Sequence, residues 1–219
     1  MDFSAVIFDL DGTLLYTLEE IATVGNNALA GFGYATHPVS AYRNFVGSGA
    51  RVLALRILPE EARTPENHER VFAAVLDEFE RLLNTLTRPY SGIPEVLDLL
   101  QVAGKKLAVL SNKPDAFTKA AMAEFLPDTD FFEIRGGSPD FPLKPAPDGA
   151  LAIAANMGIA PEHIVFVGDS DVDIKTAINA GMIPVGAGWG FRGPEELAAA
   201  GASVVFSNPG ELEKLLYPI

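Results

Sequence analysis

Residues 4–13 read SAVIFDLDGT, a short apolar run that ends in two aspartates two positions apart. The AVIF segment at positions 5–8 is continuously apolar, as expected for a central parallel strand that is covered on both faces. Gly12 permits a sharp turn, so we expect Asp9 and Asp11 at the carboxyl end of this strand, where open α/β sheets bind their ligands. Two carboxylates about 4 Å apart repel by about 4 kcal/mol at an effective dielectric of about 20. This pair therefore needs a cation, a shared proton, or both.

Three later segments carry polar side chains that the same architecture would bring to that edge. The apolar run KLAVL at 106–110 is followed by SNK at 111–113, and IVFV at 164–167 is followed by GDSDVD at 168–173. Between them, Lys144 begins a KPAP run, and proline ends a preceding helix and can begin the next one. A hydroxyl donor, a fixed cation and two sets of acids would then converge on one edge of one sheet.

These segments resemble the four motifs of the haloacid dehalogenase (HAD) superfamily: DLDGTL at 9–14, SNK at 111–113, KP at 144–145 and GDSDVD at 168–173. Within it the chain is most similar to phosphoglycolate phosphatase-like enzymes, and the resemblance covers essentially the whole chain. The resemblance implies magnesium-dependent phosphoryl transfer through an aspartyl-phosphate. Close relatives usually carry an acid shortly after the Gly-Thr-Leu, whereas this chain reads LYT at 15–17, a departure that concerns the cap hinge and substrate entrance rather than the chemistry.

The resemblance also assigns roles to single residues, since phosphoryl transfer depends mostly on positioning and electrostatics. Asp9 would be the nucleophile that forms a covalent phospho-carboxylate. Asp11 would donate a proton to the leaving oxygen and later take one from water, so its pKa should be raised by neighbouring acids. Ser111 and the amide of Asn112 would bind phosphoryl oxygens. Lys144 would neutralise the phosphoryl group and the carboxylate beside it.

A magnesium ion is the expected cofactor, because it prefers oxygen ligands and keeps several waters. Asp9 and Asp169 would supply side-chain ligands and Asp11 a backbone carbonyl, while Asp173 would hold a metal-bound water. Backbone amides near the turn could complete a phosphate cradle, as turns rich in free N–H groups do. These amides belong to Gly12 and Thr13.

Substrate recognition is expected from the helical insert. Arg51 follows GSG at 47–49, which resembles the cap loop of phosphoglycolate phosphatase-like proteins, and its guanidinium could pair with a substrate carboxylate or simply face solvent. The first lysine is Lys105, which rules out a Schiff-base lysine in residues 1–104 of the kind used by phosphonoacetaldehyde hydrolases. Dehalogenation is disfavoured, because Asp11 supplies an acid that C–halogen cleavage does not need. Trp189, in a glycine-rich loop, is expected either at the rim of the site or in packing.

The order of patterns predicts a doubly wound parallel α/β sheet with an all-helical cap inserted after the first strand. Residues 1–16 and 88–219 would form the catalytic core and residues 17–87 the cap. Cap helices are expected from Leu18 to about residue 31, and over 39–46, 50–58 and 65–86, the last with Thr64 as N-cap. Core helices are expected near 93–103, 115–125, 147–157, 172–180, 194–200 and 210–216, and core strands near 106–110, 131–135, 164–168, 183–187 and 203–206.

Composition narrows the possible partners. The chain has 219 residues, a net charge of -13 and no cysteine. Disulfides, thiol nucleophiles and cysteine-bound metals are therefore excluded, and binding to nucleic acid or anionic lipid is disfavoured. We expect a cytoplasmic protein, monomer or homodimer, that acts on a small-molecule phosphate ester and binds neither nucleic acid nor membrane.

Three functions remain open. The favoured one is a small-molecule phosphatase with 2-phosphoglycolate as substrate. A β-phosphoglucomutase-like mutase would share the fold and the aspartyl-phosphate, but it would depend on a sugar bisphosphate and release little phosphate. A non-enzymatic phospho-receiver module is also doubly wound with an acidic pocket, although a receiver usually lacks a helical insert after its first strand.

Overall fold

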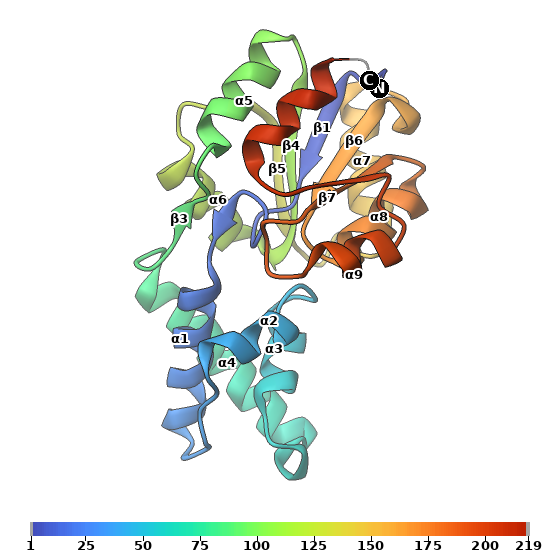
Figure 1. Cartoon of the computed structure of the whole chain (residues 1–219). Helices are drawn as coiled ribbons and strands as arrows, with labels where there is room; N and C mark the ends of the chain where they lie inside the picture. The colour runs from blue at the N-terminus through green and yellow to red at the C-terminus, as the bar shows by residue number, and fades with distance from the viewer. Residues whose placement is uncertain (1, 218–219) are drawn as a thin grey trace.

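A six-stranded parallel sheet forms the centre of the computed structural model, which describes residues 2–217 (Figure 1). The strand order is β5-β4-β1-β6-β7-β8, so the first strand of the sequence lies in the middle of the sheet. Every neighbouring pair is parallel, as predicted. The strands are β1 (Ala5–Phe8), β4 (Lys106–Pro114), β5 (Phe131–Gly137), β6 (Ile164–Gly168), β7 (Ile183–Ala187) and β8 (Val204–Phe206).

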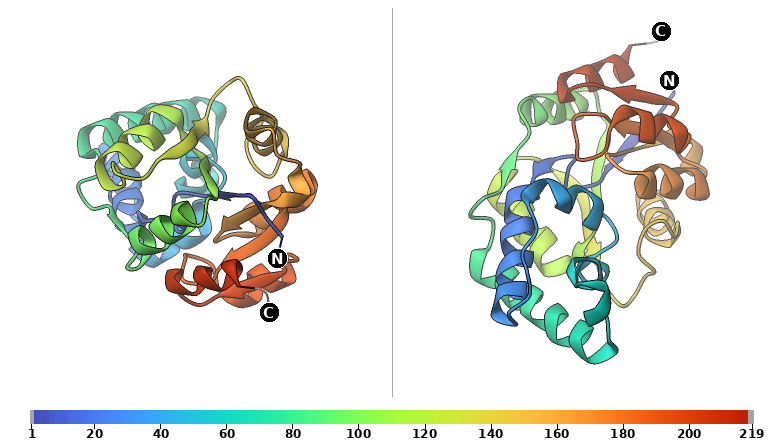
Figure 2. Two further views of the ribbon diagram at one scale, coloured as in Figure 1. Left: turned by 90° about the horizontal axis from the view of Figure 1, so that it is seen from above. Right: turned by 60° about the horizontal axis from the view of Figure 1, so that its bottom comes forward.

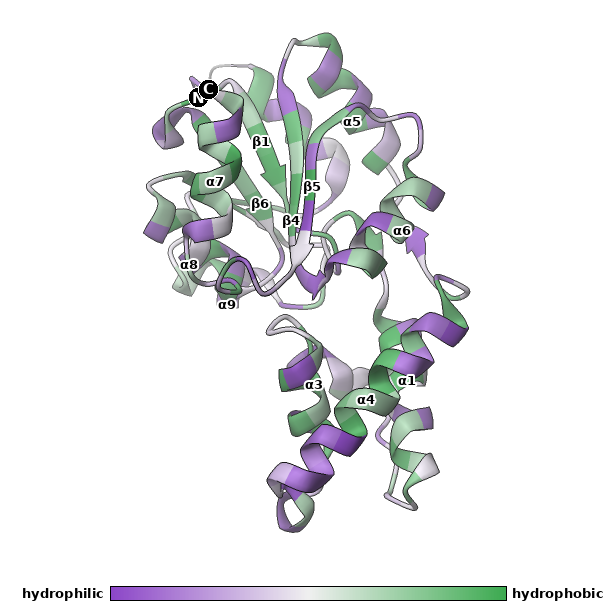
Figure 3. Ribbon diagram, turned by 180° about the vertical axis from the view of Figure 1, so that it is seen from behind, coloured by the Kyte–Doolittle hydropathy of each residue, from purple (hydrophilic) through white to green (hydrophobic). Residues whose placement is uncertain are grey.

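Helices cover both faces of this sheet, and the alternation of side chains along β1 shows why. Val6 and Phe8 belong to the apolar cluster under α5 and α6, whereas Ala5 and Ile7 belong to the cluster under α7 and α8. Successive strand residues point to opposite faces, so an unbroken apolar strand needs two covers. Figure 2 gives two further views, and Figure 3 shows the hydrophobic colour of the central strands. The covering elements are α5 (Ile93–Val102), α6 (Asp115–Phe125), α7 (Asp148–Met157), α8 (Asp171–Ala180), α9 (Pro194–Ala199) and the 3₁₀ helices η3 (Pro161–His163) and η4 (Pro209–Leu216).

A bundle of helices is inserted after the first strand and lies opposite the carboxyl ends of the sheet strands (Figure 1). The bundle has its own apolar core, to which its longest helix contributes Val71, Val75 and Phe79 at four-residue intervals. The Thr64 side chain accepts a hydrogen bond from the Asn67 N–H and caps this helix, as predicted. The elements are α1 (Leu18–Gly31), η1 (Val39–Ala41), α2 (Tyr42–Phe45), α3 (Ala50–Ile57), η2 (Glu60–Ala62) and α4 (Pro65–Leu82).

The two connections between the bundle and the sheet run side by side. Strands β2 (Leu15–Tyr16) and β3 (Arg88–Pro89) form a short antiparallel ribbon in which Tyr16 is opposite Arg88. The Arg88 guanidinium also lies over the Tyr16 ring, 4.3 Å from its centroid. Strands of two residues carry no periodicity, so this ribbon was not predicted from the sequence.

Several elements differ from the sequence expectations. Strand β4 continues beyond residue 110 to Pro114, so the SNK segment lies within the strand rather than after it. Helix α4 ends at Leu82 instead of residue 86, because the backbone leaves the helical conformation at Leu83 (φ 18°) and is left-handed at Asn84 (φ 64°). The segment expected as a helix over 210–216 is the 3₁₀ helix η4. None of the helices described here has the length and apolar character needed to span a membrane.

Candidate active site

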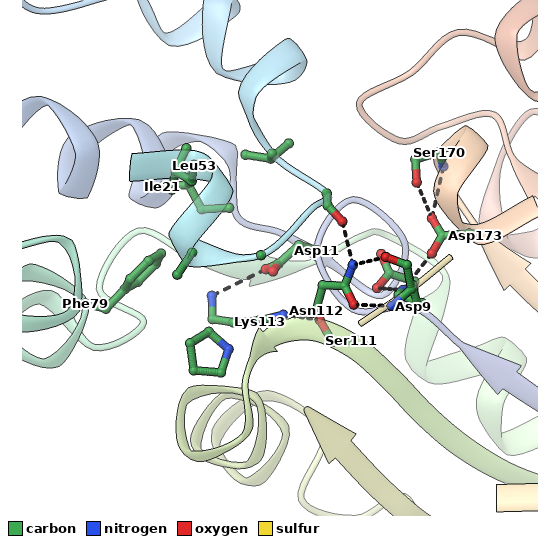
Figure 4. Close-up of a pocket in the computed structure, with 16 residues that line it drawn as sticks. Asp9, Asp11, Ile21, Leu53, Phe79, Ser111, Asn112, Lys113, Ser170 and Asp173 are labelled. Carbon is green, nitrogen blue, oxygen red and sulfur yellow. Dashed lines mark hydrogen bonds and ion pairs between the residues drawn. The ribbon is translucent and has the colours of Figure 1, made fainter. Parts of the chain in front are cut away.

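The polar side chains of four segments meet at the carboxyl edge of the sheet (Figure 4). The last residue of β1, Phe8, is level with Val109 of β4 and Val167 of β6. Asp9, which follows Phe8, therefore lies close to Ser111 of β4 and to the acidic turn that follows β6. The expected convergence follows directly from this register.

Lys144 lies at the centre of this cluster. Its Nζ is 2.6 Å from Asp9 Oδ1 and 2.6 Å from Asp173 Oδ1, and its side chain is 3% exposed. The Asn112 side chain fixes the lysine backbone, accepting a hydrogen bond from the Lys144 N–H and donating one to the Lys144 carbonyl, at 2.8 and 3.0 Å. A buried ammonium is thus held between two carboxylates, one directly after β1 and the other in the first turn of α8.

Burial and mutual repulsion keep protons on this cluster. Burial raises the pKa of Asp9 to about 7; the Lys144 charge opposes this shift, and Asp173 and Asp11 add to it. Burial, together with the charges of Asp173 and Asp9, raises the pKa of Asp169 well above its usual range. Burial works against the charge on Lys144, but attraction to Asp173 and Asp9 leaves its pKa raised. The lysine therefore stays charged, while the acids compete for any proton or cation that enters.

Three of the acids form a group suited to a hard divalent cation. Ligand oxygens of Asp9, Asp169 and Asp173 all lie within 4.8 Å of one another, and the three residues are buried. Within residues 2–217, Asp9 Oδ2 and Asp169 Oδ1 make no hydrogen bond, whereas Asp173 Oδ1 is bound by Lys144 and Oδ2 by the Ser170 N–H and hydroxyl. Divalent cations such as Mg²⁺ and Ca²⁺ take carboxylate oxygens as ligands. Asp9 and Asp169 thus offer free ligand atoms, and Asp173 is placed to act beside them.

Asp11 and Ser111 line the pocket near this acidic group. The Asp11 carboxylate is 18% exposed, and its Oδ1 is 3.4 Å from Lys113 Nζ. Ser111 is buried, and its Oγ accepts a hydrogen bond from the Lys113 N–H at 3.1 Å, which leaves the hydroxyl proton free to donate. Asp9, Asp11 and Ser111 therefore border one pocket, as the sequence predicted.

Glycines make room for the Asp169 carboxylate. Gly12 has φ +90°, and a Cβ atom there would lie 2.2 Å from Asp169 Oδ2; at Gly190 it would lie 2.3 Å from Asp169 Cβ. The Phe191 N–H, in the same loop as Gly190, donates to Asp169 Oδ2 at 2.6 Å. Two turns that are distant in the sequence thus hold this one side chain.

The turn after β1 uses its amides internally. The Gly12 N–H donates to Leu15 O at 2.8 Å and the Thr13 N–H donates to Leu10 O at 3.2 Å. Neither Gly12 nor Thr13 is among the residues that line the pocket. The expectation that these two amides bind the phosphoryl group is therefore not supported, because both donors are already engaged.

The second wall of the pocket comes from the helical bundle and is almost entirely apolar (Figure 4). The pocket between the two walls is small, about 50 Å³. The Asn112 Nδ2 group donates to Gly47 O at 2.9 Å and so ties the loop before α3 to the sheet. With its bonds to Lys144, this contact commits the whole Asn112 side chain, so only its main chain remains for phosphate. The wall residues are Ile21, Val46, Gly47, Gly49, Ala50, Leu53 and Phe79.

Two residues singled out by the sequence lie elsewhere. The Arg51 side chain is 52% exposed, forms an ion pair with Glu69 of α4, and places its guanidinium 4.2 Å from the Phe72 ring centroid. It does not line the pocket, because α3 turns that side chain toward α4. Trp189 packs against the sheet core and donates from Nε1 to Thr13 O at 2.9 Å, so it braces the turn after β1 instead of forming the rim.

Lys113 was not predicted as a site residue, yet this lysine lines the pocket. The signal was available, because Lys113 is two residues beyond Ser111 on the same strand, and such residues share a face. Phe191 was also missed, since a contact made by its backbone N–H has no signature in the sequence.

Comparison with known proteins identifies the family. The family model of the haloacid dehalogenase-like hydrolases matches residues 3–181. The chain is 32% identical to the phosphoglycolate phosphatase of Haemophilus influenzae (strain 86-028NP), with 98% of each chain covered. It is 31% identical to the N-acetylmuramic acid 6-phosphate phosphatase of Pseudomonas aeruginosa, with 99% of this chain and 96% of the other covered.

The fold comparison agrees with the sequence comparison. A solved structure of a candidate phosphoglycolate phosphatase from Lactobacillus delbrueckii subsp. bulgaricus superposes with a TM-score of 0.92 at 30% identity, covering 99% of both chains. The matched family region contains the acidic cluster and the lysine at its centre. The chain belongs to the haloacid dehalogenase-like hydrolases and is a phosphoric monoester hydrolase of the phosphoglycolate phosphatase-like kind.

Proposed function

We propose that the protein hydrolyses a small phosphomonoester, with 2-phosphoglycolate as the favoured substrate, by transferring the phosphoryl group to Asp9 with Mg²⁺ as cofactor. The observation that carries the proposal is the buried lysine bridge, in which Lys144 holds Asp9 and Asp173 at 2.6 Å each on the floor of the pocket. Such a bridge fixes the orientation of the Asp9 carboxylate, so that one of its oxygens can attack phosphorus while the other faces the cation.

In the first step, one carboxylate oxygen of Asp9 forms a bond to phosphorus while the bond from phosphorus to the ester oxygen breaks. The electron pair goes to the ester oxygen, which takes a proton from Asp11. Asp11 suits this role because its carboxyl borders the pocket, apart from the buried acids, and is partly exposed. The Ser111 hydroxyl and the Asn112 main-chain amide bind phosphoryl oxygens, and Lys144 offsets their charge.

In the second step, Asp11 takes a proton from water as the water oxygen bonds to phosphorus. The bond between phosphorus and Asp9 then breaks, which releases phosphate and restores the carboxylate. A divalent cation held by Asp9 and Asp169, with Asp173 beside them and the Asp11 carbonyl as the remaining expected ligand, would supply charge neutralisation for the phosphoryl oxygens.

The shape and lining of the pocket favour a short substrate. A single water needs about 10–15 Å³ of cavity, and the pocket in the present arrangement of cap and core is about 50 Å³. The hydroxyl groups of a sugar would face Leu53, Phe79 and their apolar neighbours without partners, and unpaired buried polar groups are costly. These features favour the substrate named for the phosphoglycolate phosphatase relatives over the amino-sugar phosphate named for another relative. They also disfavour a phosphosugar mutase.

Substrate entry requires the bundle to move. We propose that residues 17–87 swing as one cap against residues 1–16 and 88–219, with the β2–β3 ribbon as the hinge. The pocket lies between the two parts, and the Asn112 bond to Gly47 joins them in the present arrangement. Closure would exclude water during the first step, and opening would admit it for the second.

A substrate screen with Mg²⁺ tests the proposal directly. Phosphate release is measured from 2-phosphoglycolate, N-acetylmuramic acid 6-phosphate, glucose 1-phosphate with and without a sugar bisphosphate, and pyrophosphate. We expect the highest kcat/KM for 2-phosphoglycolate and none above background for Asp9→Asn. Bisphosphate-dependent conversion of the sugar phosphate with little phosphate release would instead identify a mutase.

A further inference from the structure

Lys113 is the buried pocket residue whose charge the reaction outlined above does not use. Its side chain is 3% exposed, with Nζ 3.4 Å from Asp11 Oδ1 and 5.0 Å from the centroid of the Phe79 ring. Figure 4 shows it between Asp11 and Phe79 at the mouth of the acidic cluster. Lysine is almost never fully buried unless its charge is paired. The ammonium group of Lys113 therefore needs a negatively charged partner.

The pairing of Lys113 within the protein is weak. Over residues 2–217, Asp11 supplies the one carboxylate within 4 Å of Lys113 Nζ, and at 3.4 Å this contact is long. Lys144, in the same pocket, has two carboxylates at 2.6 Å. An ammonium carries three donors. Lys113 thus retains more hydrogen-bonding capacity than Lys144, which has two of its three donors engaged.

On the side of the pocket near Asp11, Lys113 is the one cation that the described residues offer to a bound anion. Among the described residues that line the pocket, Lys113 and Lys144 are the basic ones, and the cap contributes only glycines and apolar side chains. Arg51, in the first turn of α3, forms its ion pair with Glu69 of α4 and does not line the pocket. A second negative group in the substrate, beyond the phosphoryl, would therefore have to meet Lys113.

We propose that Lys113 binds the carboxylate of the substrate and selects phosphorylated 2-hydroxy acids over neutral phosphate esters. The inference rests on the proposed function, in which the ester oxygen lies against Asp11. In a 2-phospho acid, one carbon separates that oxygen from the carboxylate carbon. The carboxylate then falls beside Asp11, where Lys113 lies, while the apolar cap wall packs against the single CH₂ group.

The first test compares two substrates that differ in one charge, 2-phosphoglycolate and its carboxamide. We expect Lys113→Met to lower the ratio of their kcat/KM values by about ten- to hundredfold, as for loss of a hydrogen bond between charged groups. Arg51→Met is the matched control, since it removes the nearby cap cation that the structure places outside, and it should leave the ratio unchanged. If Lys113→Met lowers both rates equally, Lys113 acts only through Asp11 and the proposal is overturned.

The second test measures binding without turnover. The non-hydrolysable analogue 3-phosphonopropionate and its amide are titrated calorimetrically into the Mg²⁺-loaded protein. Lys113→Met should weaken binding of the acid about ten- to hundredfold and leave binding of the amide within a few-fold, and Lys113→Arg should retain part of the preference.

The outcomes separate this inference from the proposed function. Wild-type protein that turns over an aryl phosphate but does not distinguish the acid from the amide refutes the carboxylate contact and leaves the phosphatase intact. Wild-type protein without turnover of any ester refutes both.

Discussion

Replacement of Lys144 by methionine should destabilise the metal-free protein far more than an ordinary lost salt bridge. Both carboxylates that Lys144 holds at 2.6 Å would stay buried, and removal of one partner from a buried pair costs about 3–5 kcal/mol. Lys175→Met is a matched control. Lys175 Nζ is also 2.6 Å from an aspartate, Asp171, but the two side chains are 54% and 36% exposed. Such surface pairs contribute about 0–1 kcal/mol.

The free energy of unfolding is measured by urea denaturation in the presence of a chelator, at pH 8 and pH 5. At pH 8 the Lys144→Met loss should exceed the Lys175→Met loss by at least about 2 kcal/mol. At pH 5 the difference should shrink, because the buried acids, with the pKa of Asp9 already raised to about 7, take up protons in place of the missing cation. Equal losses for the two variants at pH 8 would refute the account of the buried bridge.

Three further outcomes follow from the site. Because burial raises the pKa of Asp9 and Asp169, the folded metal-free protein holds protons that the unfolded chain lacks, and its stability should fall as the pH rises from about 4 to 7. The rise in Tm that Mg²⁺ induces should therefore be larger at pH 8 than at pH 5. A rise that does not depend on pH would contradict this linkage. Gly12→Ala should abolish Mg²⁺ binding in calorimetry, because the new Cβ atom would lie 2.2 Å from Asp169 Oδ2. Gly33→Ala is the control, since Gly33 has φ +75° but no atom within 4 Å of the Cβ position. This variant should lose only about 1 kcal/mol of unfolding free energy and bind Mg²⁺ normally. Asn112→Ala removes the tether to the cap loop, so small-angle scattering with a phosphate analogue should show a larger radius of gyration than for wild type; identical profiles would rule out the tether.

The sequence predicted the acidic cluster because parallel strands share a carboxyl edge. Asp9 and Asp169 each follow an apolar strand, and the register of β1 with β6 then places them together. Lys144 was predicted from its place between two such strands, although its contacts with two acids depend on the Asn112 side chain. The topology thus explains why these side chains meet at one edge of the sheet, and only the three-dimensional structure shows which of them form ion pairs with one another.

The sequence predictions failed where the role of a residue depends on the direction of its side chain or on the partner of its backbone amide. Arg51 is two residues before Leu53 on α3, and residues two apart do not share a helix face, so the helical period already disfavoured both in one pocket. By contrast, nothing local in the sequence reveals that the Gly12 amide is used within its own turn, or that the Phe191 N–H reaches Asp169. Such contacts depend on loop conformation, which carries no periodic signal.

The assignment of Asp9 as nucleophile and Asp11 as acid and base is tested most directly by rapid mixing with a nitrophenyl phosphate, whose leaving group needs little protonation. Asp11→Asn should release a stoichiometric burst of nitrophenol and then turn over about 10²–10⁴-fold more slowly than wild type, because no base activates water for the second step. Asp9→Asn should release no burst, since it lacks the attacking carboxylate, and circular dichroism should show that both variants are folded. A burst from Asp9→Asn, or near-wild-type turnover by both variants, would contradict the account.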